Sequence, residues 1–111
     1  MKNRRLLFSV LSAVLGVGLA TTTAVRAEGD VKAGQVKAIP CLGCHAIPGY
    51  SNVYPTYHVP RVGGQQAEYI VAALKAYRAG ERSHRTMQAQ AATLSDQDMA
   101  DIAAYFSAKP E

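Results

Sequence analysis

Apolar residues recur at helical spacing in three stretches of the chain, and these stretches predict three helices. The first covers residues 31–38, with Asp30 as its N-cap and Gly34 on its apolar face. Glycine lowers helix stability, so its place there indicates that another backbone approaches closely. The second covers about residues 66–79 and ends at Gly80, a common helix terminator. Its apolar stripe consists of Ala67, Ile70, Val71, Leu74 and Tyr77.

The third predicted helix begins at Ser95. Ser95 and Asp98 are close to a capping box, with aspartate where glutamate or glutamine is usual. Leu94 and Met99 occupy the hydrophobic staple positions on either side of this cap. The helix is predicted to end at Lys109-Pro110. Its buried stripe consists of Met99, Ile102, Ala103 and Phe106.

Two long segments between these helices, residues 46–64 and 81–94, show neither a helical nor a strand period. The first contains three prolines, three glycines and three tyrosines. Loops this long inside a compact domain are usually functional. We therefore predict an all-α fold in which three main helices and long loops surround the functional site, and we predict no strand.

Residues 1–27 have the composition of a secretory signal peptide. A basic start precedes an apolar run over residues 6–20, and Ala27 ends a plausible cleavage site. The basic start consists of Lys2, Arg4 and Arg5. The apolar run is short for a membrane span, so an uncleaved anchor is the weaker interpretation. The chain is predicted to be exported to the periplasm, with residues 28–111 as one mature domain that has no transmembrane span.

The net charge of the whole chain differs from that of the predicted mature domain. The chain has 12 Lys and Arg residues and 8 Asp and Glu residues, which gives a formal net charge of +4. Four of the basic residues lie in residues 1–27, so residues 28–111 carry equal numbers of basic and acidic side chains. A nucleic-acid-binding role therefore lacks electrostatic support.

The stretch Cys41-Leu42-Gly43-Cys44-His45 reads C-x-x-C-H, the attachment signature of a c-type haem. Two thiols three positions apart lie close together on one helical turn, where they can add to the two haem vinyl groups. His45 then offers an imidazole nitrogen to the iron as the proximal ligand. A disulfide across this short loop would constrain little, a thioredoxin-like pair needs a βαβ setting, and a structural zinc site usually needs a second ligand pair. We therefore predict one covalent haem c.

An iron with one histidine ligand has a sixth position to fill. Met87 is the favoured ligand, because it lies in a predicted loop and belongs to no helical stripe. His84 and His58 remain alternatives, whereas Met99 has a structural position and Met1 leaves with the signal peptide. A histidine and methionine pair favours ferrous iron and suits electron transfer.

With these residues in place, the chain resembles class I cytochromes c, and most closely one domain of the diheme cytochrome c-four type. The resemblance covers residues 29–109. It depends on an ordered set of motifs: Gly29-Asp30 with Gly34, Cys41-Leu42-Gly43-Cys44-His45, Pro60-Arg61-Val62-Gly63-Gly64-Gln65, Ala76-Tyr77-Arg78-Ala79-Gly80-Glu81-Arg82, Thr86-Met87, Leu94-Ser95-Asp96-Gln97-Asp98 and Ile102-Ala103-Ala104-Tyr105-Phe106.

The resemblance implies the cytochrome c fold, with His45 and Met87 as the two axial ligands. It also implies that the carbonyl of Pro60 accepts the proximal imidazole N–H, and that Arg61 approaches a haem propionate. The helix that contains Gly34 would cross the C-terminal helix.

One segment departs from the family pattern. Residues 45–60 form a longer and more tyrosine-rich segment than is usual, so the resemblance does not imply the path of this loop. The chain also contains a single haem motif, so an electron relay between two haems does not carry over.

The predicted function is electron transfer. The chain would carry one electron on its haem between redox partner proteins, and it would not be a catalyst by itself. One alternative is a haem subunit of a larger oxidoreductase, which needs the same site. The other is a haem enzyme or gas sensor with a displaceable sixth ligand, for which His84 or Arg85 could be the distal group.

A basic group precedes Met87 and an acidic group follows it. The basic group is Lys75, Arg78, Arg82 and Arg85, and the acidic group is Asp96, Asp98 and Asp101. One hypothesis is that the basic group faces an acidic partner near the haem edge. Two solvated helix ends are at least as good an interpretation of the same pattern.

Overall fold

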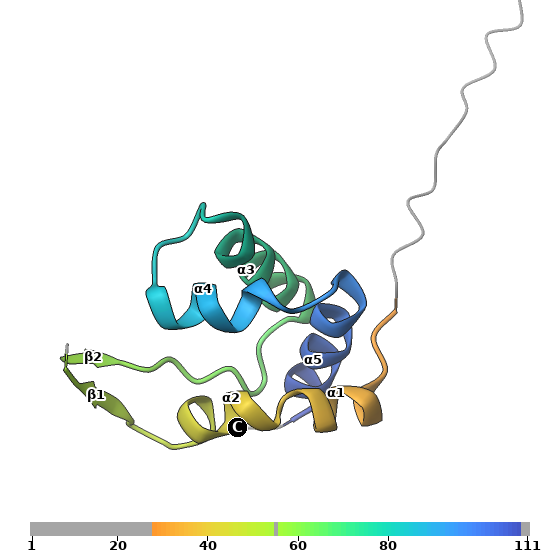
Figure 1. Ribbon diagram of the computed structural model, residues 1–111. Coiled ribbons are helices and arrows are strands. Elements are labelled where there is room, and N and C mark those ends of the chain that lie inside the picture. The colour runs from red at the N-terminus through yellow and green to blue at the C-terminus, as the bar shows by residue number, and fades with distance from the viewer. Residues whose placement is uncertain (1–27, 55, 110–111) are drawn as a thin grey trace, which may run out of the picture.

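The computed structural model describes residues 28–54 and 56–109. This part of the chain contains five helices and one two-stranded hairpin. The helices are α1 (Val31–Lys37), α2 (Ile39–His45), α3 (Ala67–Ala79), α4 (Arg85–Ala92) and α5 (Asp96–Ala108). The strands are β1 (Ser51–Val53) and β2 (Thr56–His58), which pair antiparallel. In Figure 1, α1, α2 and the hairpin run along the lower part of the view, α3 and α4 lie above them, and α5 lies beside both groups.

Helices α1 and α5 cross in close contact, and glycine permits this approach. Gly34 is buried, and a Cβ atom on it would overlap the carbonyl oxygen of Asp101 and lie 2.9 Å from the Cβ of Tyr105. A Cβ on Gly29 would overlap the carbonyl oxygen of Ala100 in the same way. The prediction that a second backbone lies against Gly34 is confirmed.

Helix α5 supplies most of the buried core. The Ser95 hydroxyl accepts a hydrogen bond from the Asp98 N–H, and the Asp98 carboxylate accepts one from the Ser95 N–H, so the predicted capping box is present. Met99 is 0% exposed, as its position on the apolar stripe predicts. The remaining core residues are Ala38, Ile70, Leu74, Ala91, Ile102, Ala103, Tyr105 and Phe106.

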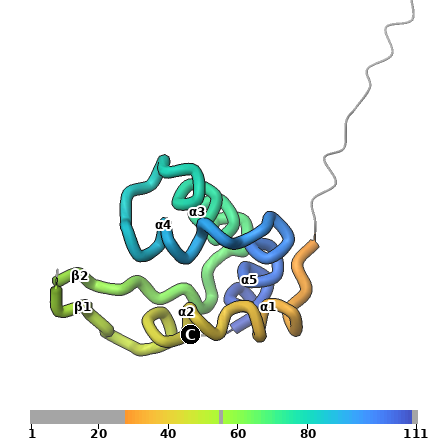
Figure 2. Tube along the Cα trace, viewed as in Figure 1, coloured from red at the N-terminus to blue at the C-terminus, as the bar shows by residue number. Residues whose placement is uncertain are grey.

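Helix α3 packs against both α5 and α4. It follows Gln66 and ends at Gly80, which has a left-handed φ of 77° and donates its N–H back to the carbonyls of Ala76 and Tyr77. A residue with a Cβ would be strained at this φ, so the glycine defines the end of the helix as predicted. Figure 2 shows the chain turn after α3 and return along α4.

Two segments that the sequence predicts to be loops contain regular structure. Helix α4 lies within residues 81–94, so the prediction of a loop around Met87 is wrong. Its N-cap is His84, which is not a usual capping residue, and tertiary packing of its buried Ala91 stabilises a helix too short to be stable alone. The hairpin of β1 and β2 lies within residues 46–64, where no strand is predicted.

Among residues 28–54 and 56–109, no helix has the length and apolar character that crossing a membrane requires. The predicted signal peptide, residues 1–27, lies outside the described residues. Its boundary with a mature domain therefore stays a prediction.

Candidate haem site

Helix α2 carries both thiols and the histidine of the haem-attachment motif. Pro40 lies in its first turn, where the missing N–H of proline costs no hydrogen bond. Cys41, Cys44 and His45 follow in the same helix, and all three are half-buried. Burial raises the pKa of the Cys41 thiol, and the neighbouring Cys44 raises it further. The helix thus holds two free thiols side by side, as attachment to two vinyl groups requires.

The imidazole of His45 is oriented by Pro60. Its Nδ1 lies 2.7 Å from the Pro60 carbonyl oxygen and donates a hydrogen bond to it. Because Nδ1 carries the proton, Nε2 keeps its lone pair for a metal ion. The preceding residue, Val59, is 6% exposed and donates its N–H to the carbonyl of Tyr50 at 2.9 Å. The buried side chain of Val59 and the hydrogen bond from its N–H therefore both hold the backbone that presents the Pro60 carbonyl.

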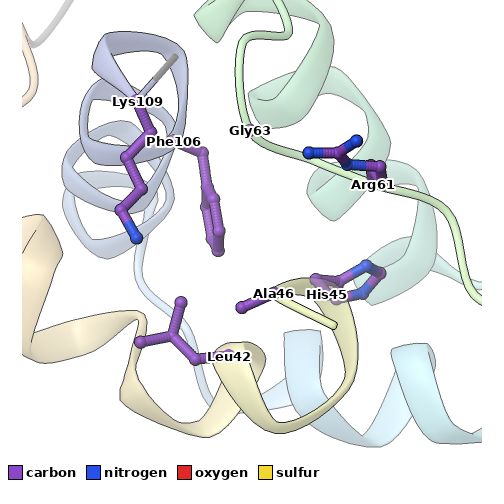
Figure 3. A pocket seen from close by; sticks show the side chains of 7 residues that line it. All are labelled: Leu42, His45, Ala46, Arg61, Gly63, Phe106 and Lys109. Atoms are coloured by element: carbon purple, nitrogen blue, oxygen red, sulfur yellow. The ribbon is translucent and has the colours of Figure 1, made fainter. Parts of the chain in front are cut away.

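A cavity of about 100 Å³ lies beside His45. Figure 3 shows His45 and Arg61 on one side of this cavity, and Leu42, Phe106 and Lys109 on the other. Leu42 and Phe106 give the cavity apolar walls, while Arg61 and Lys109 give it two cationic groups. This combination suits a group that is mostly apolar and bears negative charge at its edge.

The four candidates for the sixth iron ligand lie in different environments. Met87 is half-buried on α4 and packs against the same core cluster as Cys41 of α2. Met99 is fully buried within that cluster, so its sulfur is enclosed by protein. His84 caps α4, because its Nδ1 accepts the N–H of Met87 at 3.3 Å. His58 is exposed on β2. Among these four, Met87 is therefore the half-buried candidate whose side chain does not cap a helix.

Ion pairs join the predicted basic group to the predicted acidic group. Asp96 lies 3.0 Å from the Lys75 Nζ and 2.6 Å from an Arg78 nitrogen. The hydrogen bond from Arg78, followed by that from Lys75, lowers the pKa of Asp96. Arg82 lies over the ring of Tyr77, 4.8 Å from its centroid. Lys75 and Arg78 thus connect α3 to the start of α5. The hypothesis that the basic group faces an acidic partner stays a prediction.

The network around Lys37 is not predictable from sequence spacing. Lys37 Nζ lies 2.7 Å from Asp98 and 2.5 Å from Asp101. Asp101 is 3% exposed, and it also accepts the Asp30 N–H and the side-chain N–H of Gln97, both at 2.8 Å. Hydrogen bonding to Lys37 is the main reason that the pKa values of Asp98 and Asp101 are lowered. Lys37 and Asp101 are 64 positions apart, so no local sequence pattern predicts their contact.

The donor set of the site fits a covalently bound haem. Two thiols and an oriented imidazole lie on one helix, and a thioether lies on a second helix that packs against the same core. Half-buried apolar side chains complete the surroundings: Cys41, Leu42, Val62, Ala67, Val71, Tyr77, Met87 and Leu94. An apolar macrocycle anchored at α2 would cover these side chains.

Comparisons with known proteins identify the family. Residues 31–108 match the family model described as Cytochrome c. The chain is 38% identical over 100 residues to cytochrome c4 of Pseudomonas aeruginosa, a match that covers 90% of this chain and 47% of that protein. It is 42% identical over 84 residues to cytochrome c-554(548) of Halomonas halodenitrificans, which covers 73% of this chain and 98% of that protein.

A solved structure agrees with these matches. The crystal structure of reduced recombinant cytochrome c4 from Pseudomonas stutzeri superimposes with a TM-score of 0.58 and 27% identity, over 76% of this chain and 52% of that one. The chain thus spans about half the length of the cytochrome c4 relatives that it matches. Its attachment motif carries one covalent haem c through Cys41 and Cys44, and cytochromes c are electron carriers. The chain belongs to the cytochrome c family.

Proposed function

We propose that this cytochrome c carries single electrons in the periplasm on a haem whose iron is held by His45 and Met87. The observation that carries the proposal is the 2.7 Å hydrogen bond from His45 Nδ1 to the Pro60 carbonyl. This contact fixes the tautomer and the orientation of the ring, so that Nε2 faces away from Pro60 as a ligand. A histidine that follows two attachment cysteines and is oriented in this way is equipped to bind iron.

Met87 is the proposed partner of His45. Bound haem supplies an iron that alternates between the ferrous and ferric states. A thioether sulfur favours the ferrous state, and Met87 offers one from a half-buried position against the core. Because α4 and the core restrict its movement, Met87 would keep its place when the oxidation state changes. Small rearrangement on electron transfer is what a carrier needs.

Arg61 is proposed to pair with a haem propionate. Its side chain lines the same cavity as His45, and its own carbonyl accepts a hydrogen bond from Gln65 Nε2. The hydrogen bond holds the backbone at this position while the guanidinium extends into the cavity wall. A guanidinium forms charge-assisted hydrogen bonds with carboxylates, which is the chemistry that a propionate offers.

The periplasmic location is supported by the signal-peptide pattern of residues 1–27 and by the bacterial origin of the relatives named above. The partners would be redox proteins that donate and accept one electron. A carrier that diffuses between partners and a haem subunit bound to a larger oxidoreductase would use the same axial ligands.

The optical spectrum of the oxidised holoprotein tests this proposal. A weak far-red band reports a bond between ferric iron and a thioether, and we expect to observe it. Met87→Ala should abolish the band. Met99→Leu, which preserves side-chain volume in the core, should keep it and serves as the matched control.

Two results would contradict the proposed ligation. If the parent protein lacks the far-red band, the iron has either two histidine ligands or an open position. Carbon monoxide added to the reduced protein distinguishes these cases, since rapid binding would favour a haem enzyme or gas sensor. If the band survives in Met87→Ala, another sulfur binds the iron.

A further inference from the structure

The hairpin of β1 and β2 contacts the start of the helix that carries Met87. Tyr57 of β2 lies edge-on against His84, with ring centroids 4.7 Å apart and an angle of 89° between the ring planes. Both residues are half-buried. The hairpin lies in residues 45–60, the segment whose length and tyrosine content depart from the family pattern.

His84 also caps the first turn of α4. It is the N-cap residue, and its Nδ1 accepts a hydrogen bond from the backbone N–H of Met87 at 3.3 Å. A capped N–H restrains the residue that carries it, and here that residue is Met87. The ring that Tyr57 contacts is therefore the same ring that restrains the proposed iron ligand.

Contacts within the hairpin restrain the side chain of Tyr57. Asn52 and Tyr57 face each other across the hairpin, and the Asn52 side-chain N–H donates a hydrogen bond to the Tyr57 hydroxyl. The chain then continues from β2 through the buried Val59 to Pro60, whose carbonyl accepts the His45 N–H. One loop thus contacts His45 through its end and His84 through its second strand.

We propose that Tyr57 and His84 are positioning residues that hold the Met87 sulfur on the iron. This inference rests on the proposed ligation by Met87. Tyr57 would fix the imidazole of His84 through the edge contact, and His84 would fix the start of α4 through its cap. Loss of either contact would make the sulfur easier to displace without removing any haem-attachment group.

Competition with imidazole tests the inference in the oxidised holoprotein. Imidazole binds the iron only after the thioether leaves, so its apparent affinity reports how firmly Met87 is held. Tyr57→Ala and His84→Ala should each increase this affinity three- to tenfold, because an edge-to-face ring contact and a helix cap each contribute about that much to an equilibrium. In both variants the far-red band should also disappear at a lower temperature than the far-UV circular dichroism signal.

Conservative and matched variants separate positioning from general stability. Asparagine is a good N-cap but lacks the ring that Tyr57 contacts, so His84→Asn should recover part of the difference in imidazole affinity between His84→Ala and the parent, but not all of it. Tyr57→Phe keeps the ring and should change the affinity less than Tyr57→Ala does. Tyr54→Ala is the matched control, because Tyr54 belongs to the same hairpin but is 93% exposed. If Tyr57→Ala proves too unstable to purify, Tyr57→Leu keeps apolar bulk and removes the edge contact.

The outcomes distinguish this inference from the ligation on which it rests. If the far-red band depends on Met87 but Tyr57→Ala and His84→Ala behave like Tyr54→Ala, the inference is overturned and the ligation stands. In that case the contact between Tyr57 and His84 does not affect how firmly the sulfur is held. If the band is absent from the parent or survives in Met87→Ala, the ligation fails and the inference fails with it.

Discussion

The crossing of α1 and α5 differs sharply from the region formed by α2, the hairpin and α4. Helix α5 buries six of its residues, and Gly34 and Gly29 bring α1 and the residues before it against the backbone of α5. In contrast, α2 buries no residue and α4 buries Ala91 alone. Both strands of the hairpin have a half-buried central residue between two exposed ones.

This difference shows where the protein supplies its own core and where it is organised around haem attachment. At the crossing, apolar side chains of the chain cover one another, so that packing is complete within the polypeptide. In the other region the half-buried Cys41, Leu42 and Met87 pack against that core. A domain of this size buries only about 60–65% of its unfolded surface, so we expect the covalent haem to supply much of its stability.

Removing the thioether bonds should have the largest effect. In Cys41→Ala/Cys44→Ala, haem is no longer held, and we expect most of the chain to lose cooperative structure even though the α1–α5 crossing is untouched. Far-UV circular dichroism during urea denaturation measures this loss. A cooperative, native-like transition in the double variant would contradict the prediction and would show that the crossing and the core suffice to fold the domain.

Adding one methyl group at the crossing should have the next largest effect. Gly34→Ala places a Cβ against the Asp101 carbonyl, which is backbone and cannot move without shifting α5. Overpacking of this kind costs about 3 kcal/mol, measurable as a lower urea midpoint of the holoprotein.

Gly63→Ala is the matched control for this substitution. A Cβ on Gly63 would lie 3.9 Å from the Lys109 carbonyl oxygen, which is ordinary contact, so its stability should stay within about 0.5 kcal/mol of the parent. Equal losses in the two variants would mean that close approach of α1 and α5 is not what Gly34 provides.

The features that could be predicted from sequence are those with a local signal. Ser95 and Asp98 form the expected capping box, Gly80 ends α3, and Met99 lies in the core, because each depends on spacing within a few residues. The haem-attachment motif is local in the same sense. The position of Gly34 indicates that another backbone approaches closely, but not which one. The resemblance to cytochromes c implies that this backbone belongs to the C-terminal helix.

The features that escaped prediction depend on contacts between distant segments. Helix α4 has an unusual cap in His84 and only one fully buried residue, so its helical state comes from packing rather than from an apolar stripe. The hairpin has strands of three residues, too short for an alternating pattern to stand out. The buried carboxylate of Asp101 meets Lys37 across 64 positions. Ligation by Met87 remains a prediction for the spectrum to test.

Acid should weaken the crossing more than it weakens the region around α2, because the crossing contains the Lys37 network. The pKa values of Asp98 and Asp101 lie below 3.8 in the folded protein, so the charged carboxylates contribute stability above that pH and lose it as the pH falls through their folded values. The pKa of Lys37 lies above 10.5, so its contribution is complete below that pH and is lost only as the pH rises further. The network should therefore be at full strength between about pH 5 and 10.

Asp101→Asn tests this smaller effect through urea midpoints at pH 7, 5 and 3. The amide cannot form the ion pair with Lys37, so the midpoint of the variant should be lower than that of the parent at pH 7 and 5. The difference should shrink at pH 3, because below the ordinary pKa of 3.8 the aspartate of the unfolded parent binds protons more readily than the folded one, whose pKa is lowered. Glu81→Gln removes an exposed carboxylate after α3 and should leave the parent profile unchanged. If Asp101→Asn loses as much stability between pH 5 and 3 as the parent does, the acid sensitivity arises elsewhere, and loss of the iron ligands becomes the first explanation to examine.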